Sequence, residues 1–222
     1  MRRHLALLTM ALIGATLGLA PTVGATGERA SGSFVDGAGN TIGEARLEQV
    51  AVGTVRLTIT LRDATVVTPG QHGIHFHAVG ACAGPDFATA GPHFNPTARM
   101  HGAKNPQGPH AGDLPNLTVT TAADGPTATL TTTAITLAGG PATIFDADGT
   151  ALVIHANPDD EATDPAGNSG GRVACAVLKA VVPGMPNTGG GGGQPSAVWL
   201  LGSILAGTLG MGGLLRRRAH GR

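Results

Sequence analysis

Histidines are concentrated in one part of this 222-residue chain, and their spacing indicates a metal site. Six of the nine histidines lie between His72 and Asp113. His75 and His77 are two residues apart in the run GIHFHAVG, and on a β-strand this spacing places both imidazoles on the same face. His155 lies in the apolar run ALVIHA, which is typical of a buried strand.

Three further histidines and one carboxylate follow the first pair at wide intervals. His93, His101 and His110 are separated by eight and nine residues, and Asp113 comes three residues after His110. These intervals do not fit one face of a single helix. We therefore expect a long loop that folds back over the strand carrying His75 and brings these side chains close to it.

The types of these side chains indicate which metals they could bind. Four neutral imidazoles form the tetragonal all-nitrogen site that Cu(II) prefers, and three imidazoles with one carboxylate form a closed tetrahedral zinc site. Two such sites need seven imidazole ligands, one more than the six side chains discussed above provide. One histidine would therefore use both ring nitrogens and bridge the metals. His93 is the natural bridge, because it lies between the two groups in sequence.

Several motifs together resemble those of copper/zinc superoxide dismutases. They occur in the family's order from about Ser31 to Val182, and they read GIHFHAVG, AGPHFNP, His101, HAGDLPN, VIHANPDD and GRVACAV. The resemblance implies one copper ion and one zinc ion as cofactors. It assigns copper to His75, His77, His93 and His155, and zinc to His93, His101, His110 and Asp113.

The resemblance also implies roles outside the two ligand sets. Asp159 would join ligands of the two metals through hydrogen bonds, and Arg172 would hold the superoxide anion beside copper. The implied activity converts superoxide to oxygen and hydrogen peroxide by cycling of a copper ion that His93 bridges to zinc. The alternative is a surface copper/zinc buffer or chaperone with the same fold and no turnover. The presence of all four copper positions and Arg172 favours the enzyme.

Side-chain alternation predicts an all-β domain. Residues 55–61 alternate between apolar and polar, as in a half-buried strand, and residues 117–119 and 128–130 give weaker strands separated by a turn at 124–126. No run has convincing helical periodicity, and glycine and proline fall between the strands. With the resemblance, the prediction is a Greek-key β-sandwich or barrel with long metal-binding and active-site loops.

The resemblance pairs Cys82 with Cys175, and a secreted chain with two cysteines most simply joins them. The alternative is two free buried thiols. A disulfide would close a loop of about ninety residues and would attach the metal-binding loop to the barrel.

The N-terminal residues 1–25 are typical of a signal peptide. Arg2 and Arg3 form a basic start, an apolar run follows, and Val23-Gly24-Ala25 supplies a cleavage site with small residues. Either Sec or twin-arginine export fits this pattern. The predicted mature domain is therefore 26–183.

The C-terminal segment has the order of a cell-wall sorting signal. A Pro/Gly-rich linker spans 184–196, an apolar stretch spans 197–215, and a basic tail spans 216–222. Within the linker, Met185-Pro186-Asn187-Thr188-Gly189 resembles the LPxTG motif that a sortase cleaves after threonine, before attachment to peptidoglycan. Without cleavage, 197–215 would be a transmembrane anchor. Both outcomes predict a secreted protein held at the outer cell surface.

The charges of the predicted domain argue against binding to nucleic acid. They also influence the expected rate of superoxide capture. It carries eight basic residues against fourteen acidic ones, a net charge of −6, with no tyrosine or tryptophan to stack bases. The loop between His155 and Arg172 contains no lysine that could attract an anion. We therefore predict capture slower than the diffusion limit, with Lys104 as a candidate compensating cation.

We expect the other polar residues of this region to have structural or surface roles rather than to bind metal. We expect His72 to brace the turn before the strand of His75 rather than to bind metal. Asp160, Glu161 and Asp164 would form a solvated acidic rim.

Overall fold

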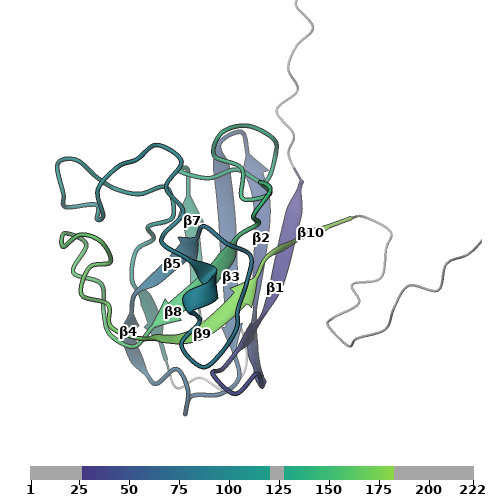
Figure 1. Cartoon of the computed structure of the whole chain (residues 1–222). Helices are drawn as coiled ribbons and strands as arrows, with labels where there is room; N and C mark the ends of the chain where they lie inside the picture. Colours follow the sequence, from purple (N-terminus) through teal and green to yellow (C-terminus); the bar gives the residue numbers. More distant parts are fainter. Residues whose placement is uncertain (1–26, 121–127, 183–222) are drawn as a thin grey trace, which may run out of the picture. The chain divides into compact units, whose positions relative to one another are not determined.

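The computed structural model describes residues 27–120 and 128–182, which form an almost entirely β-structured unit (Figure 1). Its strands are β1 (Arg29–Val35), β2 (Thr41–Ala51), β3 (Thr54–Leu61), β4 (Gly70–His72), β5 (Ile74–His77), β6 (Leu117–Val119), β7 (Ala128–Thr132), β8 (Ala151–His155), β9 (Arg172–Val177) and β10 (Lys179–Val181). Within these described ranges, the single helical element is a short 3₁₀ turn, η1 (Ala88–Ala90). The all-β prediction is therefore confirmed.

Several predicted segments lie outside the described residues. These are the signal peptide 1–25, the turn 124–126, the linker 184–196, the apolar stretch 197–215 and the tail 216–222. In the part of the chain that the structure describes, no helix has the length and apolar character needed to cross a membrane.

Eight strands form one antiparallel sheet with the order β5–β8–β9–β1–β2–β3–β7, in which β10 pairs with β1. The remaining two strands, β4 and β6, form a small sheet of their own. The large sheet curls, so that β5, β8 and β9 lie across β1, β2 and β3 (Figure 1). Strands far apart in sequence, such as β5 and β8, are neighbours, and this connectivity confirms the predicted Greek-key β-sandwich.

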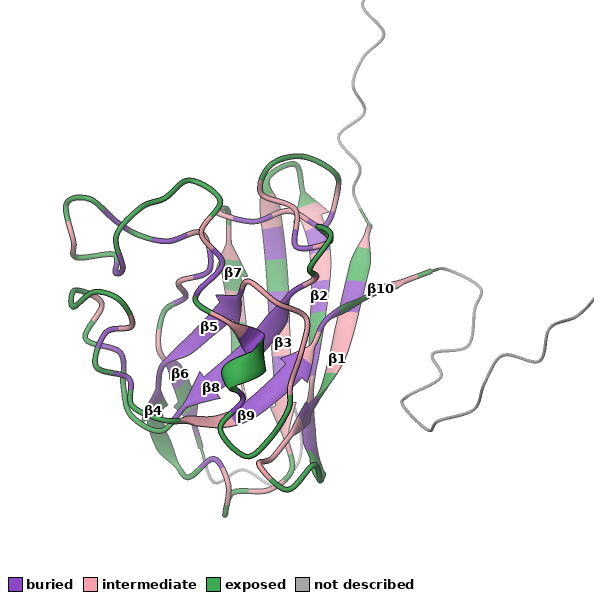
Figure 2. Ribbon diagram, in the orientation of Figure 1, coloured by how far each residue is buried: buried purple, intermediate pink, exposed green. Residues whose placement is uncertain are grey.

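The interior lies between the two parts of the curled sheet. Val55, Leu57 and Ile59 of β3 are fully buried while Arg56 is exposed, as the alternation predicts. All residues of β5 and β8 are buried (Figure 2). Ile74 and Phe76 of β5 belong to the main apolar core. Because side chains alternate along a strand, His75 and His77 lie on the opposite face, which the loop after β5 covers.

The segment 78–116 folds back over β5, as predicted. Isolated β-bridges join His75 to Asp113 and His77 to His93. Backbone hydrogen bonds reinforce this contact, since Phe76 N donates to Gly112 O at 2.9 Å. A long segment with little regular structure is thus held by the same strand that carries the first pair of histidines.

A disulfide joins Cys82 of this segment to Cys175 of β9, which confirms the predicted pairing and excludes two free thiols. Cys175 belongs to a small second apolar cluster with Phe87 and Val153. The start of the loop is therefore attached to the sheet both covalently and by packing.

Candidate metal centre

Four histidines from three parts of the chain meet on the covered face of β5. His75 and His77 come from β5, His155 from the end of β8, and His93 from the loop. All four are buried, and their nitrogen atoms suitable for metal binding lie within 4.8 Å of one another. The structure therefore brings together the four residues of the predicted copper set.

Hydrogen bonds on the outer side of each ring determine which nitrogen faces the centre. His77 Nδ1 donates to Gly91 O at 2.8 Å, and His155 Nδ1 donates to Gly170 O at 3.2 Å. His75 uses its other nitrogen, because Nε2 lies 2.7 Å from Asp159 Oδ2. A neutral imidazole that donates from one nitrogen keeps a lone pair on the other. The three rings therefore direct a lone pair inward.

The inward nitrogens have no hydrogen-bond partner. His75 Nδ1, His77 Nε2, His93 Nε2 and His155 Nε2 are all buried and unpaired. Buried polar atoms without partners are rare in folded proteins, because each one costs free energy. Four such atoms converging on one point fit a site for a copper ion.

A second group surrounds the carboxylate of Asp113. Its Oδ1 atom lies 2.9 Å from His93 Nδ1, 3.1 Å from His101 Nδ1 and 3.2 Å from His110 Nδ1. The contact with His101 lacks hydrogen-bond geometry, and that buried nitrogen is unpaired. Three Nδ1 atoms and one carboxylate oxygen are the donor set of a closed zinc site. His93 belongs to both groups, with Nδ1 in this one and Nε2 in the other.

Asp159 connects the two groups, as predicted. Its Oδ2 contacts His75 Nε2 at 2.7 Å, and its Oδ1 contacts His101 Nε2 at 3.0 Å. The side chain of Asn116 holds Asp159 in place, because it accepts from Asp159 N at 2.7 Å and donates to Asp159 O at 2.8 Å. Asn116 is part of the motif HAGDLPN, but a single sequence does not reveal which residue it contacts.

Gly167 explains how the chain packs so closely around Asp159. It has a φ of 60°, and a Cβ atom built there would collide with Asp159 Oδ1 and would lie 2.7 Å from His101 Nε2. A side chain at this position would therefore separate the hydrogen-bonded partners. Sequence reasoning missed this residue, because a glycine in a glycine-rich loop carries no local signal.

A β-bulge places His155 beside Arg172. The register of β8 and β9 shifts between Ile154 and His155, so that Ile154 pairs with Ala174 and His155 pairs with Arg172. Bulges of this kind redirect a side chain at the end of a ladder. The predicted anion-binding arginine is thereby held next to a member of the first histidine group.

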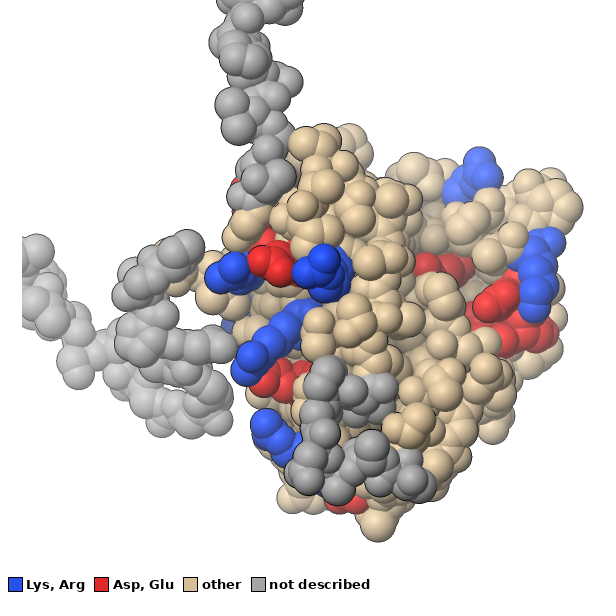
Figure 3. Space-filling view, turned by 180° about the vertical axis from the view of Figure 1, so that it is seen from behind, with Lys and Arg blue, Asp and Glu red and all other residues tan. Residues whose placement is uncertain are grey.

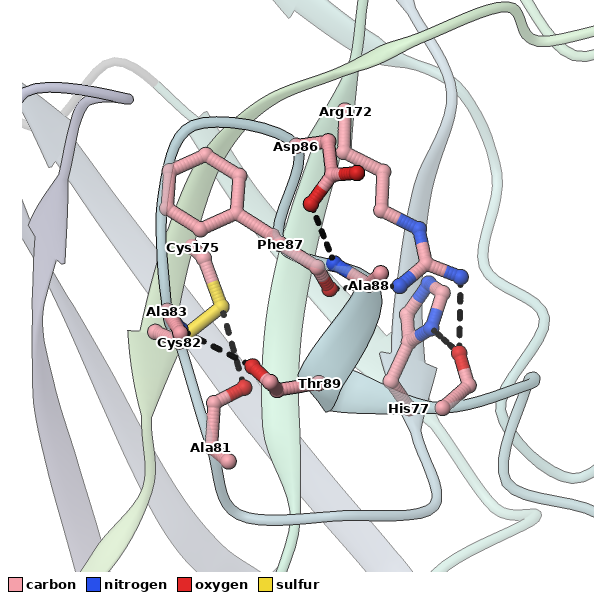
Figure 4. The surroundings of a disulfide bond; sticks show 11 residues. His77, Ala81, Cys82, Ala83, Asp86, Phe87, Ala88, Thr89, Arg172 and Cys175 are labelled. Carbon is pink, nitrogen blue, oxygen red and sulfur yellow. Dashed lines mark hydrogen bonds between the residues drawn. A yellow bond between two sulfur atoms is a disulfide. The ribbon is translucent and has the colours of Figure 1, made fainter.

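Two backbone carbonyls hold the guanidinium of Arg172 (Figure 4). Nη1 donates to Phe87 O at 2.6 Å and Nη2 donates to Gly91 O at 2.7 Å. Gly91 O also accepts from His77 Nδ1, so one carbonyl orients both side chains. Among the described residues, no carboxylate forms an ion pair with Arg172. Its positive charge therefore remains available for an anion.

Burial sets the protonation of the first histidine group. It lowers the pKa of His77 to about 2, that of His155 to about 3 and that of His93 to about 4. These rings are neutral near pH 7, which is the form that binds a metal ion.

The second group contains charges of opposite sign. Burial opposes the charged form of His101, but the adjacent carboxylates of Asp113 and Asp159 outweigh it and raise the pKa of His101 to about 9. Burial raises the pKa of the Asp113 and Asp159 carboxyls. Their contacts with His101 and neighbouring groups outweigh burial and hold both pKa values well below the ordinary range. In the metal-free protein, the protonated His101 ring thus lies between the carboxylates of Asp113 and Asp159 and supplies a positive charge to both.

Other polar residues near the site occupy different positions. His72 is buried, with Nδ1 2.8 Å from His155 O and Nε2 2.8 Å from Thr68 O, so it braces the turn as expected. Lys104 lies 3.2 Å from Glu161 Oε2, so a neighbouring carboxylate offsets part of the charge of this candidate compensating cation. Asp164 does more than form a solvated rim, because its Oδ1 accepts from His101 N at 2.7 Å.

Comparisons with known proteins agree with this geometry. The family described as copper/zinc superoxide dismutase matches residues 41–178. Superoxide dismutase (Cu-Zn) 1 of Aquifex aeolicus is 40% identical over 146 residues, which cover 66% of this chain and 85% of that protein. Superoxide dismutase (Cu-Zn) of Caulobacter vibrioides is 48% identical over 117 residues, which cover 51% and 66% of the two chains.

A solved structure gives the same result for the fold. The crystal structure of a SOD-like protein from Bacillus subtilis superposes with a TM-score of 0.60 at 36% identity, covering 67% of this chain and 97% of that one. Fold and site together define a β-sandwich metalloprotein with two adjoining histidine-rich centres. The chain belongs to the copper/zinc superoxide dismutase family, and it is an enzyme of that class with copper and zinc as cofactors.

Proposed function

We propose that this protein removes superoxide outside the cell through two metal sites that share His93. The copper ligands are His75, His77, His93 and His155, and the zinc ligands are His93, His101, His110 and Asp113. The observation that carries this assignment is the set of four buried, unpaired nitrogens beside a carboxylate contacted by three Nδ1 atoms. His93 supplies one nitrogen to each group.

When bound, copper supplies the alternating oxidation and reduction by which two superoxide ions and two protons become oxygen and hydrogen peroxide. His93 would also serve as a proton donor and acceptor in this reaction. With both ions bound its ring would lose the second ring proton. Its Nε2 atom, which is buried and otherwise unpaired, would be the atom that holds a proton whenever it is not bound to copper.

Arg172 attracts and orients the superoxide anion in this proposal. Its two backbone hydrogen bonds use one N–H of Nη1 and one of Nη2, so three of the five N–H groups remain for a ligand. A guanidinium offers a permanent positive charge and a rigid fork of donors that suits a small anion. The pairing of His155 with Arg172 places this fork beside the first histidine group.

Substitution of the shared histidine tests the assignment. His93→Ala should lower the affinity of both metal sites and abolish copper-dependent superoxide turnover, because one ring serves both groups. His72→Asn is the control for the loss of a buried imidazole, since the His72 ring contacts the backbone oxygens of His155 and Thr68 rather than the ligand atoms of the two groups. Metal content after dialysis against a chelator gives the readout. Retention of both metals by His93→Ala would contradict the shared ligand.

We also propose that the enzyme acts at the outer cell surface. Residues 1–25 support export, and the Cys82–Cys175 disulfide is typical of an oxidising compartment. Met185-Pro186-Asn187-Thr188-Gly189, with 197–215 and 216–222 after it, supports attachment to peptidoglycan by a sortase or, without cleavage, a membrane anchor.

Fractionation of cells that express the full chain separates these outcomes. Release by a wall-degrading enzyme indicates attachment to peptidoglycan, and release by detergent alone indicates the membrane anchor. Thr188→Ala should abolish wall attachment and leave the membrane form. Recovery of the whole enzyme in the cytoplasm would contradict the proposed location.

A further inference from the structure

The turn that holds Arg172 also carries a negative charge. Phe87, whose carbonyl accepts from Arg172 Nη1, directly follows Asp86 in the chain. The carboxylate of Asp86 accepts a hydrogen bond from Ala88 N at 3.1 Å, which keeps it on this turn. Figure 4 shows the turn with Asp86, Phe87 and Ala88 beside Arg172 and the disulfide. An exposed carboxylate is therefore fixed near the arginine without forming an ion pair with it.

The charge of Asp86 acts on Arg172. Burial lowers the pKa of Arg172 below its ordinary value, and the negative charge of Asp86 opposes this change. A charge that stabilises the guanidinium also cancels part of the positive potential that an approaching anion meets.

Several other cations in the described residues are already paired with carboxylates. Lys104 pairs with Glu161, and on the outer sheet face Arg29 and Arg46 pair with glutamates at 3.0 and 2.9 Å. Positive and negative side chains accordingly lie next to one another on the face seen from behind (Figure 3). The potential near Arg172 is therefore sensitive to a single carboxylate on its own supporting turn.

We propose that Asp86 is a rate-setting residue that weakens the attraction of Arg172 for small anions and keeps superoxide capture below the rate that the arginine alone would support. This inference rests on the proposed role of Arg172 as the anion-binding residue. The hydrogen bond to Ala88 N does not require the charge, because an asparagine or serine oxygen can accept it equally well. The structural and the electrostatic contributions of Asp86 can therefore be separated.

The test compares Asp86→Asn and Asp86→Ser in the full-length, metal-loaded protein. Both variants keep an acceptor for Ala88 N and remove the charge. We expect superoxide decay to accelerate about two- to fivefold at low ionic strength and the difference to fade as salt screens the charges. The affinity for azide, a small anion, should rise by a similar factor in titrations followed by copper absorption.

Glu48→Gln is the matched control, since it changes the net charge by the same amount on the outer face of β2. Glu48 pairs with Arg29, and Arg29 lies at the opposite end of β1 from Val35, which pairs with Cys175 of β9. Six residues of strand span roughly 20 Å, about twice the screening length of ~10 Å at 0.1 M salt. At that ionic strength the control should leave decay rate and azide affinity unchanged, and at lower salt it should change them less than the Asp86 substitutions do.

The outcomes separate this inference from the proposal on which it rests. If Arg172→Ala weakens superoxide capture and azide binding but Asp86→Asn and Asp86→Ser match Glu48→Gln, the role of Asp86 is overturned alone. If Arg172→Ala changes neither quantity, the role of Arg172 fails as well. If Asp86→Asn accelerates capture in the native protein but not in the Arg172→Ala background, the effect acts through the arginine as proposed.

Discussion

His93 directs its two ring nitrogens to different partners. Nδ1 lies 2.9 Å from Asp113 Oδ1, and Nε2 is buried without a hydrogen-bond partner among the inward nitrogens of the other histidine group. The isolated β-bridge between the backbones of His77 and His93 sets this orientation, because it fixes the loop against β5. One imidazole can thus serve two sites, which resolves the shortage of one ligand in the sequence.

Loss of the Asp159 charge should weaken both metal sites. Asp159→Asn replaces the carboxylate that contacts His75 and His101 with an amide that accepts from only one of its two terminal atoms. We expect a roughly 10- to 100-fold loss of metal affinity, as is typical when residues that orient metal ligands are changed. Competition with a calibrated chelator measures it.

Asp160→Asn provides the control for that variant, because the exposed Asp160 side chain bonds to Thr163 and other groups of its own loop. Metal affinity should be almost unchanged in Asp160→Asn. Equal losses in the two variants would mean that loop stability, rather than the connection between the metal groups, determines affinity.

A single methyl group at position 167 should disturb the site. Gly167→Ala places a Cβ against Asp159 Oδ1 and strains a residue with a φ of 60°. We predict a loss of about 1–3 kcal/mol in unfolding free energy together with weaker zinc binding. Gly139→Ala is the control, because a Cβ there meets nothing within 4 Å. Chemical denaturation of the metal-free proteins would refute the account if both substitutions cost the same.

Removal of the disulfide should cost stability and affect Arg172. The Cys82–Cys175 bridge spans 93 residues, so the chain-entropy model predicts a loss of roughly 4–5 kcal/mol in the Cys82→Ser/Cys175→Ser variant. The turn that supplies Phe87 O to Arg172 starts at Cys82, so azide affinity should also fall. Urea unfolding and azide titration measure the two effects. Unchanged azide binding in a folded variant would show that packing alone positions the arginine.

The metal-free protein should be most stable at about pH 7, where the folded and unfolded chains bind equal numbers of protons. The folded-state pKa values of His77, His93 and His155 are lowered to about 2, 4 and 3, against an ordinary histidine value of 6.5. Between pH 6.5 and about 4 the unfolded chain binds protons that the folded chain does not. Stability should therefore fall with falling pH, by about 1.4 kcal/mol per pH unit for each histidine.

His101 has the opposite effect on the alkaline side. Its pKa is raised to about 9, so its contribution is complete below pH 6.5 and is lost as the pH rises towards 9. Urea unfolding of chelator-treated protein from pH 4.5 to 9 tests both arms. With copper and zinc bound, the acid limb should begin at lower pH, because protons must then displace the metals. A flat profile without metals would contradict the burial of neutral histidines.

Much of the site could be predicted because its residues form local patterns. The two-residue spacing of His75 and His77 places them on one face of a strand, and the apolar run around His155 predicts a buried strand; the structure has both. The alternation in 55–61 predicts β3 for a similar reason. In each case the evidence lies within a few neighbouring residues.

The residues that sequence reasoning missed act through contacts between distant segments. Asn116 holds Asp159 across 43 residues, and Gly167 is needed because two other side chains occupy the space around it. Lys104 is a candidate for attracting superoxide on sequence alone, but its partner Glu161 lies 57 residues further along the chain. Register shifts such as the bulge at His155 depend on the pairing of two strands, which one strand alone does not specify.

The rate of superoxide decay with one copper and one zinc bound per chain tests the central claim most directly. We predict copper-dependent, cyanide-sensitive turnover that is largely lost in Arg172→Ala and retained in Arg46→Ala, whose side chain lies on the outer sheet face and pairs with Glu44. Tight binding of both metals without turnover would contradict this account and would indicate a protein that stores or delivers copper and zinc.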